Sequence, residues 1–150
     1  MNAITATDPP LDELYREVIL DHARRPRNRG ALASPTQTAS GLNPVCGDEI
    51  ELDLALSGGS IGDIAFRGQG CSISQASCSM LTERLKGRSV VEAHRITAEV
   101  RAMLTGVGEA SESLGDLEVL AGVAKFPVRV KCALLCWNVL EQGLQQATQN

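Results

Sequence analysis

The stretch DEIELDLALSGGSIGDIAFRGQG, residues 48–70, decides the fold class, because its periodicity is that of two strands joined by a turn. Residues 57–60, SGGS, supply the turn, and residues 61–67 return as the second strand of a hairpin. The region before Cys46 predicts a third strand more faintly. Apolar residues occupy every second position of the first strand, which is typical of a half-buried strand: Ile50, Leu52, Leu54 and Leu56.

Helical spacing of apolar residues flanks this hairpin on both sides. One helix is predicted from residue 11 to a stop before Pro26, and others over 73–87, 89–104, 117–124 and 129–146. Gly87 is a plausible stop signal, and Ser89 with Glu92 forms a possible capping box. This order predicts an α+β fold with a small antiparallel sheet of about three strands packed against several helices. We expect one domain over residues 11–150 and a flexible leader over residues 1–10.

Composition limits the function classes. A net charge of −4 over 150 residues disfavours nucleic-acid binding, which needs a basic stripe. Four arginines in residues 24–29 stand out, and we interpret them as a solvated face, with a partner-docking patch as the alternative. No apolar run approaches the roughly 20 residues of a membrane span, and the first residues lack a signal-peptide pattern. We therefore expect a cytoplasmic protein that binds neither nucleic acid nor membrane.

The five cysteines divide into two groups. Cys46 lies on the loop before the hairpin, Cys71 lies where the second strand gives way to a helix, and Cys132 is predicted in the first turn of the last helix. If the helices pack on one face of the sheet, these boundaries can converge at one end of it. Cys78 and Cys136 lie on apolar helix stripes, so we predict that both are buried in the core.

Three boundary thiols together with Asp48 predict a metal site. Three thiolates and one carboxylate form a complete tetrahedral shell for zinc, which accepts sulfur and oxygen ligands. Helix N-termini at Cys71 and Cys132 would favour the thiolate form. The shell is net negative, and Arg129 and Lys131 flank Cys132. Both histidines are predicted to lie in helices away from this site, so neither is expected to be a ligand.

Four motifs carry a family resemblance, and together they span nearly the whole chain. They are LDHARRPRNRG at 20–30, NPVCGDEIEL at 43–52, GQGCSISQASCSML at 68–81 and FPVRVKCALLCW at 126–137. In this order they resemble the U-type iron–sulfur assembly proteins, namely IscU and the NifU N-terminal domain, and most closely the SufU branch. Scaffold-type IscU members carry a histidine where this chain has Lys131. The long segment over 88–125 is also similar to the SufU branch.

The resemblance implies a function as well as a compact α+β fold. It implies zinc held by Cys46, Asp48, Cys71 and Cys132, and a zinc-dependent sulfurtransferase activity. A SufS-type, PLP-dependent cysteine desulfurase would form a persulfide, and Cys46 would accept its terminal sulfur for a downstream SUF cluster scaffold. A desulfurase histidine would replace the Cys46 thiol on zinc. Cys46 is the expected catalytic residue, since its loop is freer to move than the two helix-borne cysteines.

The same residues also suit functions of other classes. The same cysteines suit iron or a transient [2Fe-2S] cluster, which would make the protein a scaffold for cluster assembly. A structural zinc module whose role is docking would unfold when the metal is removed and would carry no reactive thiol. A dithiol redox protein is disfavoured, because the sequence has no C-x-x-C pair.

Overall fold

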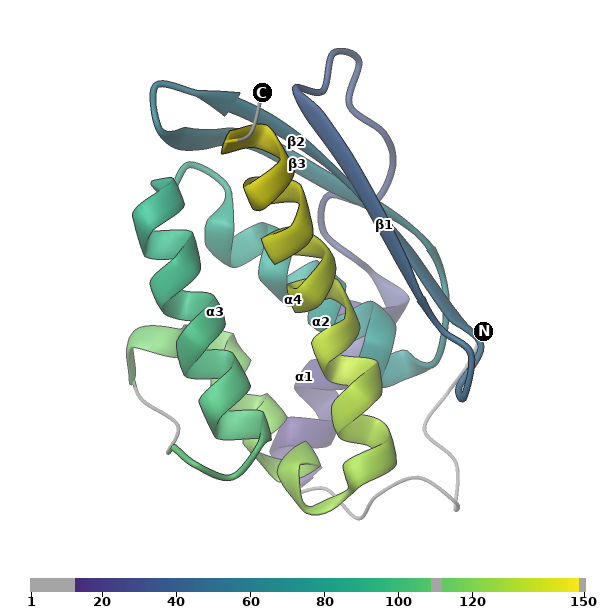
Figure 1. The fold of residues 1–150 in the computed structure, drawn as a ribbon. Helices are drawn as coiled ribbons and strands as arrows, with labels where there is room; N and C mark the ends of the chain where they lie inside the picture. The colour runs from purple at the N-terminus through teal and green to yellow at the C-terminus, as the bar shows by residue number, and fades with distance from the viewer. Residues whose placement is uncertain (1–12, 109–111, 149–150) are drawn as a thin grey trace.

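The computed structural model describes residues 13–108 and 112–148, and the leader predicted over 1–10 lies outside them. The helices and strands follow the predicted order of one helix, a sheet and then further helices (Figure 1). Their bounds are α1 Glu13–Arg24, β1 Gln37–Asn43, β2 Asp48–Ser57, β3 Ser60–Gln69, α2 Ser72–Leu85, α3 Val90–Leu104, η1 Glu112–Lys125 and α4 Pro127–Thr148. The η1 segment is a 3-10 helix with a break at Gly115.

The sheet has three antiparallel strands in the order β1-β2-β3, which confirms the predicted fold class. The weak strand signal before Cys46 corresponds to β1, whose last residue Asn43 pairs with Asp48 at the start of β2. Strands β2 and β3 form the predicted hairpin, with Glu49 opposite Gln69 at the far end from its turn. Residues 28–30 bond to the free edge of β3, since the backbone N–H of Gly30 donates to the Phe66 carbonyl at 2.8 Å. That cover removes one exposed sheet edge.

The helices cover one face of this sheet in two layers. Helix α4 packs against β1 and β2, and α2 packs against β3, while α1, α3 and η1 lie outside them (Figure 1). Close approach of α4 to the sheet requires glycine. A Cβ on Gly41 would lie 2.8 Å from Val139 Cγ2, and one on Gly143 would lie 3.1 Å from Leu54 Cδ1. The core between the layers is mostly aliphatic, with Trp137 and Phe66 fully buried.

Asp53 breaks the polar-out pattern of β2. Its side chain is buried, with Arg67 Nη1 at 3.0 Å, the Leu32 N–H at 3.0 Å and the Thr38 hydroxyl at 2.8 Å. Burial tends to raise the pKa of this carboxyl, but the hydrogen bonds from Arg67, Leu32 and Thr38 outweigh it and lower the pKa. Asp53 therefore attaches the chain before β1 to the outer face of the sheet.

The predicted helix ends are correct in α2 and α3 but not in α4. Helix α2 ends at Leu85, and Gly87 follows with φ +83°. Ser89 caps α3 by accepting the N–H of Glu92. Helix α4 begins at Pro127 rather than near residue 129, because the Phe126 carbonyl already accepts the N–H groups of Arg129 and Val130. Cys132 consequently lies in the second turn, not the first as predicted, and gains less from the helix dipole.

Cys78 and Cys136 are buried in the core, as predicted. Burial is the main cause that raises the pKa of Cys78 well above its ordinary value, so this thiol stays protonated. Beside them the hydroxyl of Ser77 bonds to the Ala133 carbonyl at 2.7 Å and accepts the Trp137 indole N–H at 3.0 Å. This hydroxyl satisfies polar groups of α4 that would otherwise be buried without partners.

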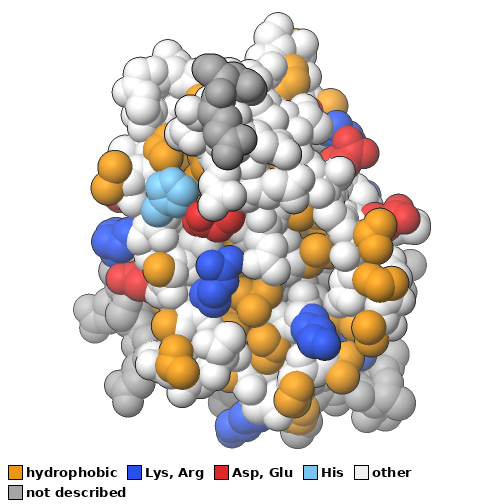
Figure 2. Space-filling model, in the orientation of Figure 1, with side chains coloured by type: hydrophobic (Ala, Val, Ile, Leu, Met, Phe, Trp, Pro, Cys, Tyr) orange, Lys and Arg blue, Asp and Glu red, His pale blue; other side chains and the backbone are white. Residues whose placement is uncertain are grey.

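Basic side chains are scattered singly over the face seen in Figure 2. Within residues 13–108 and 112–148, no helix is both long and apolar enough to cross a membrane. Two residues of the arginine-rich segment make contacts within the chain at the surface: Arg27 pairs with Asp21 at 2.8 Å, and Arg29 donates to the Gly68 carbonyl at 2.8 Å.

Candidate metal centre

Three of the four predicted ligands meet at the end of the sheet. Cys46 lies in the turn at 44–47 between β1 and β2, Asp48 begins β2, and Cys132 projects from α4. One ligand atom from each lies within 4.8 Å of the others. The Cys46 and Cys132 sulfurs are 3.0 Å apart. Residues separated by 86 positions in the chain therefore contact one another directly.

The turn that carries Cys46 is fixed at both ends. Asn43 pairs with Asp48 across the strands, and its side-chain oxygen accepts the Val45 N–H at 3.2 Å. Gly47 has φ +71°, a conformation that favours glycine. Cys46 is half-buried, whereas Asp48 and Cys132 are fully buried. Cys46 is thus the thiol of this trio that solvent and a partner can reach.

Cys71, the fourth predicted ligand, is connected to the cluster through a hydrogen bond to Asp48. It is the N-cap of α2, where its sulfur accepts the Ser74 N–H at 3.4 Å. Its own N–H donates to Asp48 Oδ1 at 3.1 Å, and the neighbouring Cys132 thiol lowers the pKa of the Cys71 thiol. Cys71 lies outside the trio whose ligand atoms are all within 4.8 Å of one another, but its N–H binds one member of that trio, Asp48.

The Asp48 carboxylate occupies space that only glycine leaves open. A Cβ on Gly70 would lie 2.5 Å from Asp48 Oδ1 and 3.0 Å from Ser74 Oγ. Among the described residues, the other carboxylate oxygen, Oδ2, is buried without a hydrogen-bond partner. A buried carboxylate oxygen is costly unless it is paired or bound to a cation. The donor set therefore fits a metal ion that accepts sulfur and oxygen.

Electrostatics at the cluster favour a bound cation. The hydrogen bond from Cys132 is the largest influence on the pKa of Cys71 and lowers it to about 7, while burial opposes the change. The same hydrogen bond, together with burial, raises the pKa of Cys132 far above its usual range. Like charges this close cannot all ionise by themselves. Arg129 is the nearby cation that favours the Cys71 thiolate.

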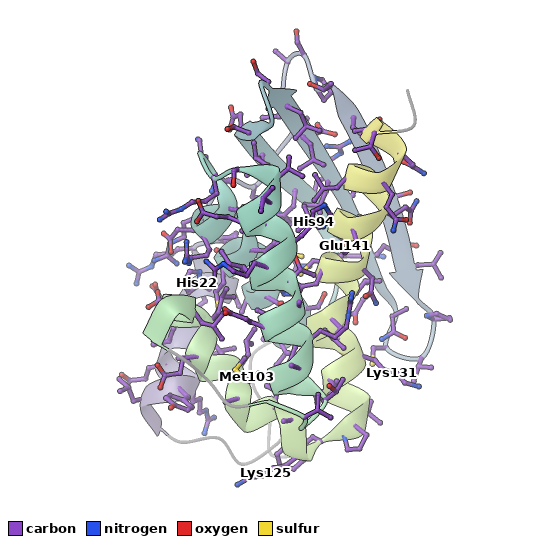
Figure 3. The ribbon with its side chains drawn as sticks, turned by 60° about the vertical axis from the view of Figure 1, so that its left-hand side comes forward. His22, His94, Met103, Lys125, Lys131 and Glu141 are labelled. Carbon is purple, nitrogen blue, oxygen red and sulfur yellow. The ribbon has the colours of Figure 1, made fainter. Side chains whose placement is uncertain are left out.

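Two supporting residues escaped the sequence prediction. Asn43 orients the Cys46 turn, and Ser74 donates its N–H to Cys71. The Asn-Pro pair before Cys46 is a turn signal that could have identified the first, whereas the second depends on the cap geometry of α2. Neither histidine belongs to the trio of ligand atoms; His94 on α3 lies beside Glu141 on α4 (Figure 3), and His94 Nδ1 is 3.1 Å from Glu141 Oε1.

Comparison with known protein families gives a match over residues 14–133 to the NifU-like N terminal domain. The chain belongs to this family. Its NifU-like domain is 45% identical over 135 residues to the "Zinc-dependent sulfurtransferase SufU" of Bacillus subtilis, covering 89% of this chain and 91% of that protein. It is 41% identical over 138 residues to the "Iron-sulfur cluster assembly scaffold protein IscU" of Streptococcus pyogenes, covering 91% and 86%.

Solved structures share the fold of this NifU-like domain. A crystal structure of a putative iron–sulfur cluster assembly scaffold protein for the SUF system, from Fervidobacterium islandicum, superposes with a TM-score of 0.82. The two sequences are 34% identical, and the match covers 85% of this chain and 94% of that one. A NifU-like N-terminal structure from Brucella abortus, 24% identical, has a TM-score of 0.86, covers 93% and 97%, and supports the fold alone.

Proposed function

We propose that this protein is a zinc-dependent sulfurtransferase of iron–sulfur cluster assembly, which accepts persulfide sulfur on Cys46 from a SufS-type cysteine desulfurase. The observation that carries the proposal is the accessible Cys46 thiol, which lies 3.0 Å from the buried Cys132 sulfur at a cluster completed by Asp48 and Cys71. The name of the Bacillus subtilis relative, a zinc-dependent sulfurtransferase, supports the same function.

Zinc would be held by Cys46, Asp48, Cys71 and Cys132. When bound, it keeps its thiol ligands deprotonated at neutral pH. The chain itself provides the rest of the environment. The Cys71 N–H fixes one oxygen of Asp48, and the α2 N-terminus stabilises negative charge on the Cys71 sulfur through the Ser74 N–H. Arg129 adds positive charge beside the cluster.

The transfer step balances without an added oxidant. The Cys46 thiolate attacks the outer sulfur of the desulfurase persulfide, and a new sulfur–sulfur bond forms on Cys46. The sulfur–sulfur bond of the desulfurase breaks, and its cysteine leaves as a thiolate. The persulfide sulfur is thereby exchanged between two cysteines with no net oxidation.

Cys46 suits this role better than the other cluster thiols because of its position. Cys46 is half-buried in an exposed turn between two strands, whereas the Cys132 side chain is fully buried on α4. Cys71 is half-buried, but its sulfur is engaged as the α2 cap. Only Cys46 can therefore approach a partner through movement of a short turn. The sulfur would then pass to a downstream SUF scaffold in the cytoplasm.

A second candidate is a scaffold on which a [2Fe-2S] cluster is assembled by the same cysteines. The scaffold name of the Streptococcus pyogenes relative favours it, and thiolates bind iron–sulfur clusters as readily as zinc. Iron content and visible absorption of protein isolated without oxygen separate the two candidates.

The test is cysteine turnover by the cognate desulfurase in iron-free buffer, with and without zinc-loaded protein. We expect substoichiometric protein to stimulate turnover strongly and the Cys46→Ala variant to lose the effect. Cys136→Ala is the matched control, because that thiol is buried in the core and bonds to the Ser77 hydroxyl at 3.4 Å. No stimulation by the intact protein, with a cluster forming once iron is added, would establish the scaffold instead.

A further inference from the structure

A second group of ligating side chains lies where α1, α2 and η1 meet. His22 on α1 is 1% exposed, and its Nε2 lies 3.5 Å from Asp116 Oδ2 on η1 and 4.0 Å from Glu83 Oε1 on α2. One ligand atom from each of the three side chains lies within 4.8 Å of the others. Figure 3 shows His22 beside the η1 segment, on the opposite side of the molecule from Lys131.

These separations suit chelation better than hydrogen bonding. A good N–H···O bond has a donor–acceptor distance of about 2.9 Å, and within the described residues His22 Nε2 has no partner closer than 3.5 Å. Two ligands bound at about 2.1 Å with a tetrahedral angle lie about 3.4 Å apart. The distances from Nε2 to the two carboxylate oxygens, 3.5 and 4.0 Å, are close to this spacing. A buried ring nitrogen with no short hydrogen bond thus faces the carboxylates.

The other ring nitrogen of His22 is fixed, as in many metal sites. His22 Nδ1 lies 2.8 Å from Ser79 Oγ, and the backbone N–H of Arg27 donates to the same hydroxyl oxygen at 2.9 Å. With the proton on Nδ1, Ser79 accepts both hydrogen bonds and Nε2 presents its lone pair to the carboxylates. Such an outer hydrogen bond orients the imidazole and sets its tautomer.

Charge and access are also suitable. The two carboxylates match a divalent cation, and Arg27 lies 3.6 Å from the other oxygen of Glu83, so it holds that side chain without occupying Oε1. Solvent reaches the ligands, because the Glu83 and Asp116 side chains are 49% and 63% exposed. A hollow leads to them and leaves space for water ligands; it is lined by Met80, Leu114 and Leu117 and by the basic side chains of Arg84, Lys86 and Arg88.

The geometry points to a second metal site, at which His22 Nε2, Glu83 Oε1 and Asp116 Oδ2 bind a divalent first-row transition cation. Imidazole selects such cations over Mg²⁺ and Ca²⁺, and the absence of sulfur from the ligand set distinguishes this site from the thiol cluster. The bound cation connects three elements far apart in the sequence, and it stabilises η1 against α1 and α2.

Manganese is the suitable probe for this site. The protein is loaded with one equivalent of zinc, which the thiol cluster binds first, and is then titrated with Mn²⁺, which is a weak competitor for thiolates. Loss of the electron paramagnetic resonance signal of free Mn²⁺ measures binding. Paramagnetic broadening of backbone amide signals in NMR spectra locates it. We expect one Mn²⁺ per chain, with broadening centred on His22, Glu83 and Asp116 rather than on Cys46.

The variants Asp116→Asn and Glu83→Gln each remove one ligand at an exposed position, so the fold is preserved where a His22 substitution would disturb the core. Each should weaken Mn²⁺ binding at least about tenfold. Glu118→Gln, two residues away on η1, is the matched control and should bind as the original chain does. The proposal is overturned if Mn²⁺ does not bind, if the broadening centres elsewhere, or if the ligand variants bind like the control.

Discussion

Replacing Gly70 by alanine tests the geometry of the thiol cluster without removing any ligand. The added Cβ would lie 2.5 Å from Asp48 Oδ1, where ordinary contact begins at 3.4 Å. Asp48 must therefore retreat by about 0.9 Å, whereas metal–ligand distances tolerate only about 0.2 Å. Gly70 does not have a positive φ, so the substitution introduces no backbone strain of that kind. The effect should fall on metal binding.

The expected loss of zinc affinity for Gly70→Ala is at least about tenfold, or about 1.4 kcal/mol of binding free energy. Competition with a chromophoric chelator measures it. Gly62→Ala is the matched control, because its Cβ would make an ordinary 3.4 Å contact with the Ala55 carbonyl. Zinc affinity in Gly70→Ala that equals the control would refute the reasoning that the Asp48 carboxylate is a ligand held in this space.

Three further substitutions test separate parts of the account. Asp53→Asn should lower the free energy of unfolding by about 1–3 kcal/mol at neutral pH, measured by urea denaturation. The pKa of Asp53 in the folded protein is lowered below its ordinary 3.8, so the carboxylate stabilises the fold above pH 3.8 and this stabilisation is lost as the pH falls through the folded pKa. A stability difference between Asp53→Asn and the original chain that does not change with pH would contradict the stabilising role of the Asp53 carboxylate. Ser77→Ala leaves the Trp137 N–H and the Ala133 carbonyl without this partner, and should cost about 2–3 kcal/mol; an unchanged melting temperature would argue against it. Cys71→Ala should reduce the bound zinc measured by mass spectrometry, whereas Cys78→Ala should leave it unchanged; equal loss in both would count against the ligand set.

The sheet was largely predictable because its signal is local. Apolar residues alternate with polar ones at Ile50, Leu52 and Leu54 because a strand that buries one face places every second side chain in the core. All three side chains are buried in the structure. Strand β1 gave a weak signal because its sequence, QTASGLN, has no β-branched apolar residue and buries only Ala39 and Asn43. The start of α4 was placed too late because Pro127 is compatible with the first helical position, a feature that the apolar spacing does not reveal.

The environments of Asp53 and His22 could not be predicted from the sequence, because they depend on residues far away in the chain. Asp53 looks like a solvent-facing residue of a half-buried strand until Arg67, 14 positions away, is brought beside it. His22 looks like part of a basic helix end, yet Ser79 and Asp116, 57 and 94 positions away, surround its ring. The thiol cluster was accessible to sequence reasoning because its residues lie at element boundaries, which tend to meet at one end of a sheet.

The central claim is that Cys46 receives the sulfur, and the most direct measurement locates the persulfide. Zinc-loaded protein is incubated with the desulfurase and cysteine in iron-free buffer, trapped with an alkylating reagent, digested and mapped by mass spectrometry. The account predicts one additional sulfur atom on the peptide that contains Cys46, and none on those containing Cys71 or Cys132. Additional sulfur on Cys71 or Cys132 with Cys46 unmodified, or on no cysteine at all, would contradict it.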